Sequence, residues 1–142
     1  MNESRIDIYN YLYGLFYETV TENVYTMGEP QELTESDTKD GFIVIRIGDA
    51  YDESEFPLET YGWVRVFVEA YIPTKSRGRV DKDKYKTFED DINDVVNTEI
   101  SSGTNAHYSI QSDGIISMEE YINSNANNAY YTFIKSFIVN ID

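Results

Sequence analysis

The strongest candidate for metal chemistry is a run of carboxylates between positions 49 and 55. Asp49, Asp52, Glu53 and Glu55 could offer oxygens to calcium, which takes about six to eight oxygen ligands. The run lacks the alternating spacing and closing glutamate of an EF-hand loop. Because the chain holds 26 acidic residues, neighbouring carboxylates are expected by chance. We therefore predict no metal site, and calcium binding by this run stays an open alternative.

Residue patterns that support catalysis are scarce. The absence of cysteine excludes thiol nucleophiles, zinc–thiolate sites and disulfides. The one histidine, His107, lies between an expected loop and an expected strand, where a surface or turn role is more common than that of a base. No nucleophile elbow, P-loop or dinucleotide-binding motif is present, and no pair of carboxylates stands out for glycoside hydrolysis. We predict a non-enzymatic protein with no cofactor.

The charged residues are unevenly distributed. The net charge of −15 disfavours nonspecific binding to nucleic-acid phosphates and to anionic membranes. A basic segment on an otherwise acidic molecule suits head-to-tail contact between copies. A solvated loop without a partner and a phosphate site are the alternatives. This basic segment holds six of the eleven basic residues: Lys75, Arg77, Arg79, Lys82, Lys84 and Lys86.

The beginning of the chain resembles no targeting signal. Residues 1–7 lack the basic start and the unbroken apolar run of a signal peptide. The longest apolar stretches are strand-sized and fall far short of the roughly 20 residues that cross a bilayer. We expect a soluble protein that is made in the cytoplasm and does not contact a membrane.

The hydrophobic pattern predicts a single α+β domain over residues 1–142. We expect a mostly antiparallel sheet of four to five strands with two helices on one face. An acidic loop covers 29–40, and residues 23–27 could form a further short strand. The expected elements are a helix at 4–20, strands at 41–48 and 62–72, a helix at 83–100, a hairpin at 108–118 and an inner strand at 130–141.

Aromatic residues are more numerous than one small domain needs to fill its core. Thirteen tyrosines are present, several of them on the first helix, which has more than one apolar face. On the long strand, three aromatic side chains share one face and need a cover, either that helix or another subunit. The residues expected to contact a partner are Tyr9, Tyr13, Tyr17, Trp63, Phe67 and Tyr71, with Lys75, Arg77, Arg79 and Lys82 of the basic segment.

The long strand from Gly62 to Pro73 is followed by a short basic loop and by a helix that begins near Lys84. This arrangement resembles the middle of tail-terminator and head–tail connector proteins of tailed bacteriophages. The order of elements is similar over nearly the whole chain. The resemblance implies a virion protein, made in the host cytoplasm, that forms a ring of six or twelve identical copies. Such a ring would join the portal and other neck or tail proteins around a channel through which DNA passes without specific binding.

Two other functional classes stay open. The aromatic face of the long strand could serve a free-standing carbohydrate- or peptide-binding module, since such platforms are often aromatic. The acidic composition could also belong to an inhibitor that blocks a basic partner. The basic segment speaks against the inhibitor, because a mimic of nucleic acid spreads acidic residues over its binding face.

Overall fold

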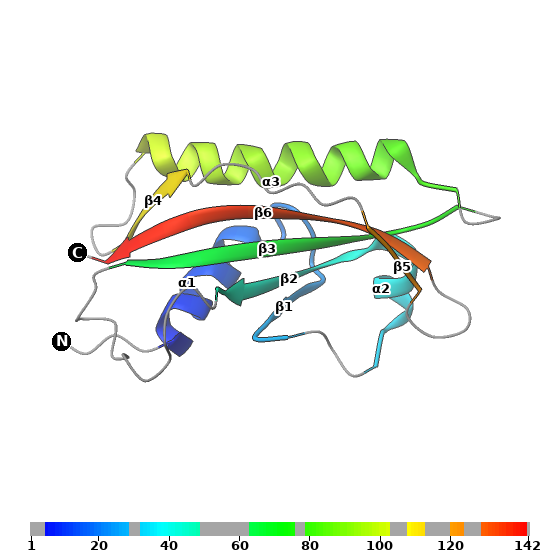
Figure 1. Cartoon of the computed structure of the whole chain (residues 1–142), viewed down its shortest axis with the longest axis horizontal. Coiled ribbons are helices and arrows are strands. Elements are labelled where there is room, and N and C mark those ends of the chain that lie inside the picture. Colours follow the sequence, from blue (N-terminus) through cyan, green and yellow to red (C-terminus); the bar gives the residue numbers. More distant parts are fainter. Residues whose placement is uncertain are drawn as a thin grey trace.

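Three helices and six strands make up the part of the chain that the computed structural model describes, residues 5–28, 32–48, 63–75, 79–102, 108–112, 120–123 and 129–141. The predicted α+β class is confirmed (Figure 1). In chain order the elements are α1 (Arg5–Phe16), β1 (Val24–Thr26), α2 (Glu35–Asp40), β2 (Phe42–Ile47), β3 (Trp63–Pro73), α3 (Lys82–Ser102), β4 (Tyr108–Ser112), β5 (Glu120–Asn123) and β6 (Ala129–Ile141).

The strands form one sheet in the order β1-β2-β3-β6-β4, and β5 also pairs with β6. The five strands of this path agree with the predicted sheet of four to five strands, and β5 adds a short further strand. All described pairs are antiparallel except β1 with β2, which run parallel. A parallel pair needs a crossover connection. Here α2 lies in that connection, within the stretch 29–40 that was expected to be a loop.

The long strand β3 alternates in burial as its sequence predicts. Val64, Val66 and Val68 are fully buried, while the residues between them are half-buried. The strand β6 lies along β3, with Phe137 opposite Val66, and its other edge pairs with β4 and β5. The predicted inner position of the last strand is therefore confirmed. The second strand of the predicted hairpin, at 115–118, lies outside the described residues.

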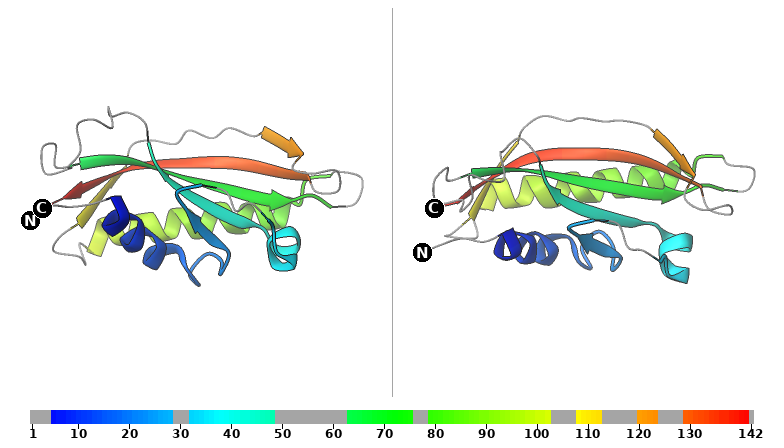
Figure 2. Two further views of the ribbon diagram at one scale, coloured as in Figure 1. Left: turned by 90° about the horizontal axis from the view of Figure 1, so that it is seen from below. Right: turned by 60° about the horizontal axis from the view of Figure 1, so that its bottom comes forward.

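Helices α1 and α3 pack on the same face of the sheet (Figure 2). In α1 the fully buried residues Ile8, Leu12 and Phe16 follow each other at intervals of four, which places them on one side of the helix. The helix ends at Phe16, four residues earlier than expected. There Glu18 adopts a left-handed backbone conformation (φ 65°), and its amide donates a hydrogen bond to the Thr21 carbonyl (3.1 Å).

Helix α3 follows the sequence pattern closely. The carboxylate of Asp81 accepts a hydrogen bond from the Lys84 amide (3.1 Å), which caps the first turn. Phe88, Ile92 and Val96 are buried against the sheet at intervals of four. At about 1.5 Å per residue, this helix of 21 residues is about 30 Å long. It therefore runs along most of β3 and β6 (Figure 1).

A smaller apolar cluster lies on the opposite face of the sheet, near α2. It contains Phe42, Val44, Tyr71 and Tyr130. Helix α2 begins with a capping box, in which Thr34 and Asp37 exchange hydrogen bonds between side chain and backbone (2.9 and 3.1 Å). The buried carboxylate of Asp37 also accepts a hydrogen bond from the Tyr25 hydroxyl (2.6 Å). This bond ties α2 to β1.

We expect the stability of the protein to fall as pH rises from about 10 to about 12. Burial and the hydrogen bond to Asp37 raise the pKa of Tyr25 from 10.0 to about 12, so the folded state favours the protonated hydroxyl. Its contribution is complete below the unfolded pKa and is lost as pH passes the folded pKa. Urea unfolding across this range should show a shallower decline in Tyr25→Phe than in the exposed-ring control Tyr13→Phe. Equal declines would contradict the assignment.

Candidate functional site

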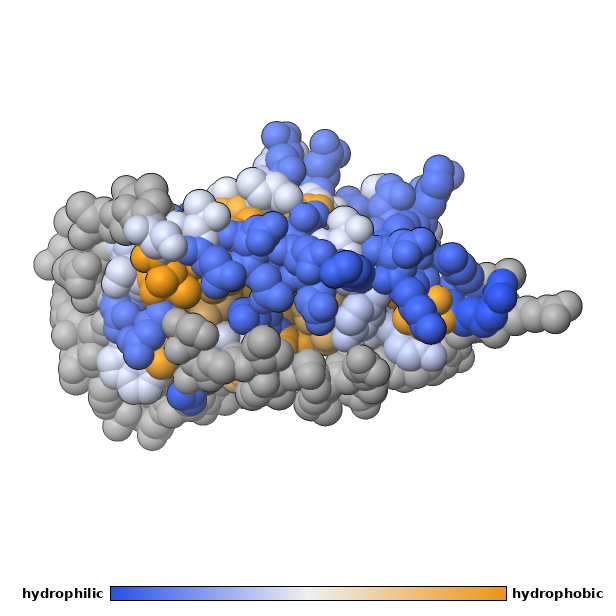
Figure 3. Space-filling view, turned by 90° about the horizontal axis from the view of Figure 1, so that it is seen from above, coloured by the Kyte–Doolittle hydropathy of each residue, from blue (hydrophilic) through white to orange (hydrophobic). Residues whose placement is uncertain are grey.

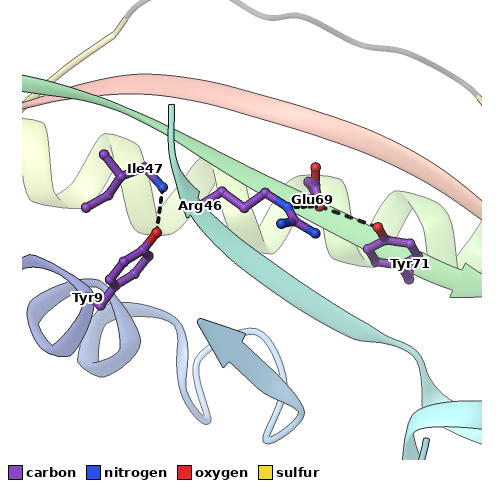
Figure 4. Close-up of polar contacts among 5 residues, drawn as sticks. All are labelled: Tyr9, Arg46, Ile47, Glu69 and Tyr71. Atoms are coloured by element: carbon purple, nitrogen blue, oxygen red, sulfur yellow. Dashed lines mark hydrogen bonds and ion pairs between the residues drawn. The ribbon is translucent and has the colours of Figure 1, made fainter. Parts of the chain in front are cut away.

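The three tyrosines in and just after α1 that were expected to contact a partner, Tyr9, Tyr13 and Tyr17, occupy different environments. Tyr9 is buried, and its hydroxyl accepts a hydrogen bond from the Ile47 amide (3.0 Å; Figure 4). Its role as a surface contact is therefore wrong, because its ring and hydroxyl serve the chain's own core. Tyr13 and Tyr17 are exposed (38% and 36%) and stack on each other, with ring centroids 5.1 Å apart. With Ile6, these two rings leave an apolar stripe on the outside of α1.

The aromatic face of β3 is less open than the sequence suggested. Tyr71 is buried and stacks on Phe42 (4.6 Å), so the structure removes it from the expected contact surface. Its hydroxyl donates to Glu69 (3.4 Å), which also accepts a hydrogen bond from Arg46 (2.9 Å; Figure 4). Trp63 and Phe67 are half-buried. Only part of each of these two side chains is therefore accessible to a partner.

The basic segment lies where β3 passes to α3, at one end of the long axis of the molecule (Figure 1). Lys75, Arg79 and Lys82 are exposed, and the Lys75 amide donates a hydrogen bond to the Arg79 carbonyl (2.7 Å). Arg77 lies outside the described residues. The start of α1 and the end of β6 lie at the opposite end of the molecule.

A groove of about 380 Å³ runs between α1 and α3. This α1–α3 groove was not predicted, since its two sides are about 80 positions apart in the chain. Its only signal in the sequence was a glycine in the middle of a helix otherwise rich in large side chains. The groove is lined mostly by apolar surface and includes two carboxylates, Asp94 and Glu99. The other lining residues are Gly14, Leu15, Thr19, Val95 and Thr98.

One hydrogen bond holds the two sides of the groove together. The Tyr11 hydroxyl donates to Glu99 (2.7 Å), and the Tyr11 ring stacks on Tyr108 (4.5 Å). Burial and this hydrogen bond raise the pKa of Tyr11 far above its usual value, so the hydroxyl stays a donor. Glu99 is itself buried, so this hydrogen bond links α1 to α3 beside the groove.

A second hollow, of about 220 Å³, follows on the same side of α3. Asp40, Lys84, Phe88 and Asp91 are among its lining residues. Partial burial and the neighbouring carboxylates Asp94 and Asp90 raise the pKa of Asp91. The space beside α3 therefore carries an excess of negative charge.

Within the described ranges, no group of three or more His, Cys, Asp or Glu side chains is arranged to hold a metal ion. The carboxylate run at 49–55 and His107 both fall in undescribed parts of the chain. None of the helices described is both long and apolar enough to span a bilayer.

No protein-family model matches this sequence, and no curated protein matches it significantly.

Proposed function

We propose that this chain is a non-enzymatic structural subunit that forms a homo-oligomeric ring in the neck or tail of a tailed bacteriophage. The ring joins the portal to the tail around the DNA channel. The observation that carries the proposal is the gathering of basic residues at one end of the long axis. Five exposed or half-exposed cations, Lys75, Arg79, Lys82, Lys84 and Lys86, gather at one end (Figure 1), while the chain as a whole carries −15.

The charges on α3 support a role outside the isolated chain. Its basic residues, Lys82, Lys84 and Lys86, all lie in the first five positions, and its last turn has no basic residue. The helix macrodipole favours the reverse order, with acidic residues first and basic residues last. The surface over α3 is mostly hydrophilic (Figure 3). Lys86 pairs with Asp90 on the same helix (3.1 Å), whereas Lys82 is exposed at the unfavourable end of the helix dipole and is more readily explained by a partner of opposite charge.

A basic surface that binds an acidic surface of the next copy makes a heterologous contact. Such contacts generate a closed ring when the rotation between neighbours divides a full turn, and a filament when it does not. Six- or twelve-fold closure follows from the resemblance to connector and terminator proteins. A net charge of −15 also repels phosphates, which suits a channel that DNA crosses without binding.

The proposal is tested by assembly in solution. We expect mass photometry and negative-stain electron microscopy of the purified chain to show closed rings with one copy number. Arg79→Glu should raise the concentration needed for assembly by about tenfold, because one contact pair becomes repulsive. Lys39→Glu is the matched control, since it makes the same change in net charge at an exposed site on α2.

A second measurement addresses the location. Antibodies against the chain should label the neck or tail of tailed particles produced by the source culture. A chain that stays monomeric at every concentration, together with particles that are not labelled, would overturn the proposal. Retention on a glycan or peptide array in place of assembly would favour the binding module instead.

A further inference from the structure

We propose that the α1–α3 groove is the receptor for the basic segment of a second copy of this chain. The inference rests on the proposed head-to-tail assembly and assigns its two contacting surfaces. The groove would hold the aliphatic stem of a lysine or arginine side chain on its apolar floor, and the exposed carboxylate of Asp94 would bind the charged end.

The lining of the groove fits that occupant. Leu15 and Val95 supply apolar surface, and Asp94 supplies an exposed carboxylate. Long cationic side chains bury their methylene groups along such surface while the charged end stays at a polar rim. The stacked rings of Tyr13 and Tyr17 lie on the exposed side of α1, and aromatic faces attract ammonium and guanidinium groups.

Gly14 points to close approach by another backbone. It is exposed in the last turn of α1, and a Cβ placed there would meet nothing within 4 Å. A glycine within a helix costs roughly 0.5–1 kcal/mol relative to alanine. The chain's own packing gives no reason for this residue. A neighbour that presses its backbone against α1 would give one, since only glycine leaves the helix surface bare there.

Two carboxylates of α3, Asp91 and Asp94, are electrostatically unfavourable in the isolated chain. Among the residues that the structure describes, neither Asp91 nor Asp94 forms an ion pair. The pKa of Asp91 is raised by partial burial and by Asp94 and Asp90, and Asp91 lines the neighbouring hollow, where Lys84 of the same chain also lies. A cation that binds at Asp94 would reduce the repulsion among these three carboxylates. Residues that lower the stability of their own fold are typical of functional surfaces.

The charges of the basic segment are too far from Asp94 to neutralise it within one chain. Lys86, the last basic residue of the segment, pairs with Asp90 (3.1 Å), and Asp94 lies eight residues beyond Lys86. At about 1.5 Å per residue, that separation is about 12 Å along the helix axis, longer than an extended lysine side chain. The proposed occupant of the groove is therefore the basic segment of a second copy.

The test uses the absence of cysteine from the natural sequence. Thr98→Cys places a thiol in the groove, and Arg79→Cys places one in the basic segment; both positions are exposed. Under mild oxidation of the double variant, we expect disulfide-linked dimers and higher multimers on a non-reducing gel. The matched control combines Arg79→Cys with Gln111→Cys, which is exposed on β4, away from the groove. It should give little cross-linking.

The outcomes separate the two proposals. If electron microscopy shows rings but positions 79 and 98 do not cross-link, the proposed role of the groove is overturned and the proposed ring is not. Failure of the wild-type chain to assemble would overturn both. A second variant pair gives an independent result: Asp94→Lys should weaken assembly about tenfold, and adding Arg79→Glu to it should restore most of the loss. No restoration would count against this pairing.

Discussion

Phe16→Ala is expected to lower the free energy of unfolding by roughly 3–5 kcal/mol. The side chain is fully buried where α1 meets the sheet, and its ring centroid lies 6.4 Å from that of Phe137 on β6. Its removal leaves a cavity that the rigid sheet cannot fill. Urea unfolding followed by circular dichroism gives the difference directly. The result decides whether α1 belongs to the core of its own chain or is a detachable arm.

The neighbouring residue supplies the control for this experiment. Tyr17 is 36% exposed and its ring contacts Tyr13 on the outside of the molecule. Substitutions on the surface usually change stability by about 0.5 kcal/mol or less, so Tyr17→Ala should leave the isolated chain nearly unchanged. Equal effects of the two substitutions would mean that α1 does not pack as described.

Gly41→Ala is expected to cost roughly 2–4 kcal/mol. Gly41 joins α2 to β2 with φ 92°, a conformation that disfavours any Cβ. An added Cβ would lie 2.7 Å from the Tyr71 carbonyl oxygen and 3.2 Å from the Phe88 ring. The backbone oxygen belongs to the β3 ladder and cannot move away without breaking strand pairing. Thermal unfolding of the variant should show a clearly lower midpoint.

Gly14→Ala is the matched glycine control, and it is expected to change the free energy of unfolding in the opposite direction. Because Gly14 has open space around it and lies within a helix, the added methyl group should stabilise the isolated chain by roughly 0.5–1 kcal/mol. If both substitutions lowered the midpoint, the strain at Gly41 could not be the cause of its effect.

Most of the fold could be predicted because its larger elements carry their own periodicity. The alternation along β3 and the intervals of four along α3 indicate both the type of element and its buried side. Helix α2 escaped prediction because its six residues include no apolar side chain. The available signal was the capping box of Thr34 and Asp37, which acts through hydrogen bonds and leaves no hydrophobic period.

The contacting residues were harder to predict for a related reason. Nearly every side of α1 is apolar, so the sequence could not tell which tyrosines face the sheet. The structure divides them by position: Tyr9 follows Ile8 on the buried side, whereas Tyr13 and Tyr17 follow Ile6 on the outer stripe. The α1–α3 groove forms because Gly14 and Thr98 lie close together in the fold. No local sequence pattern indicates that residues so distant in the chain are neighbours in space.

The basic segment makes the charge of the molecule uneven, and this has a consequence for the proposed assembly. Two copies would repel at long range, since each carries −15, and would attract where the basic segment of one faces an acidic surface of the other. At very low ionic strength the overall repulsion dominates. At high ionic strength, where the Debye length falls to about 3 Å, the attraction that orients the two copies is lost as well. We therefore expect the proposed association to be fastest at an intermediate salt concentration, with subunits that join in a single orientation.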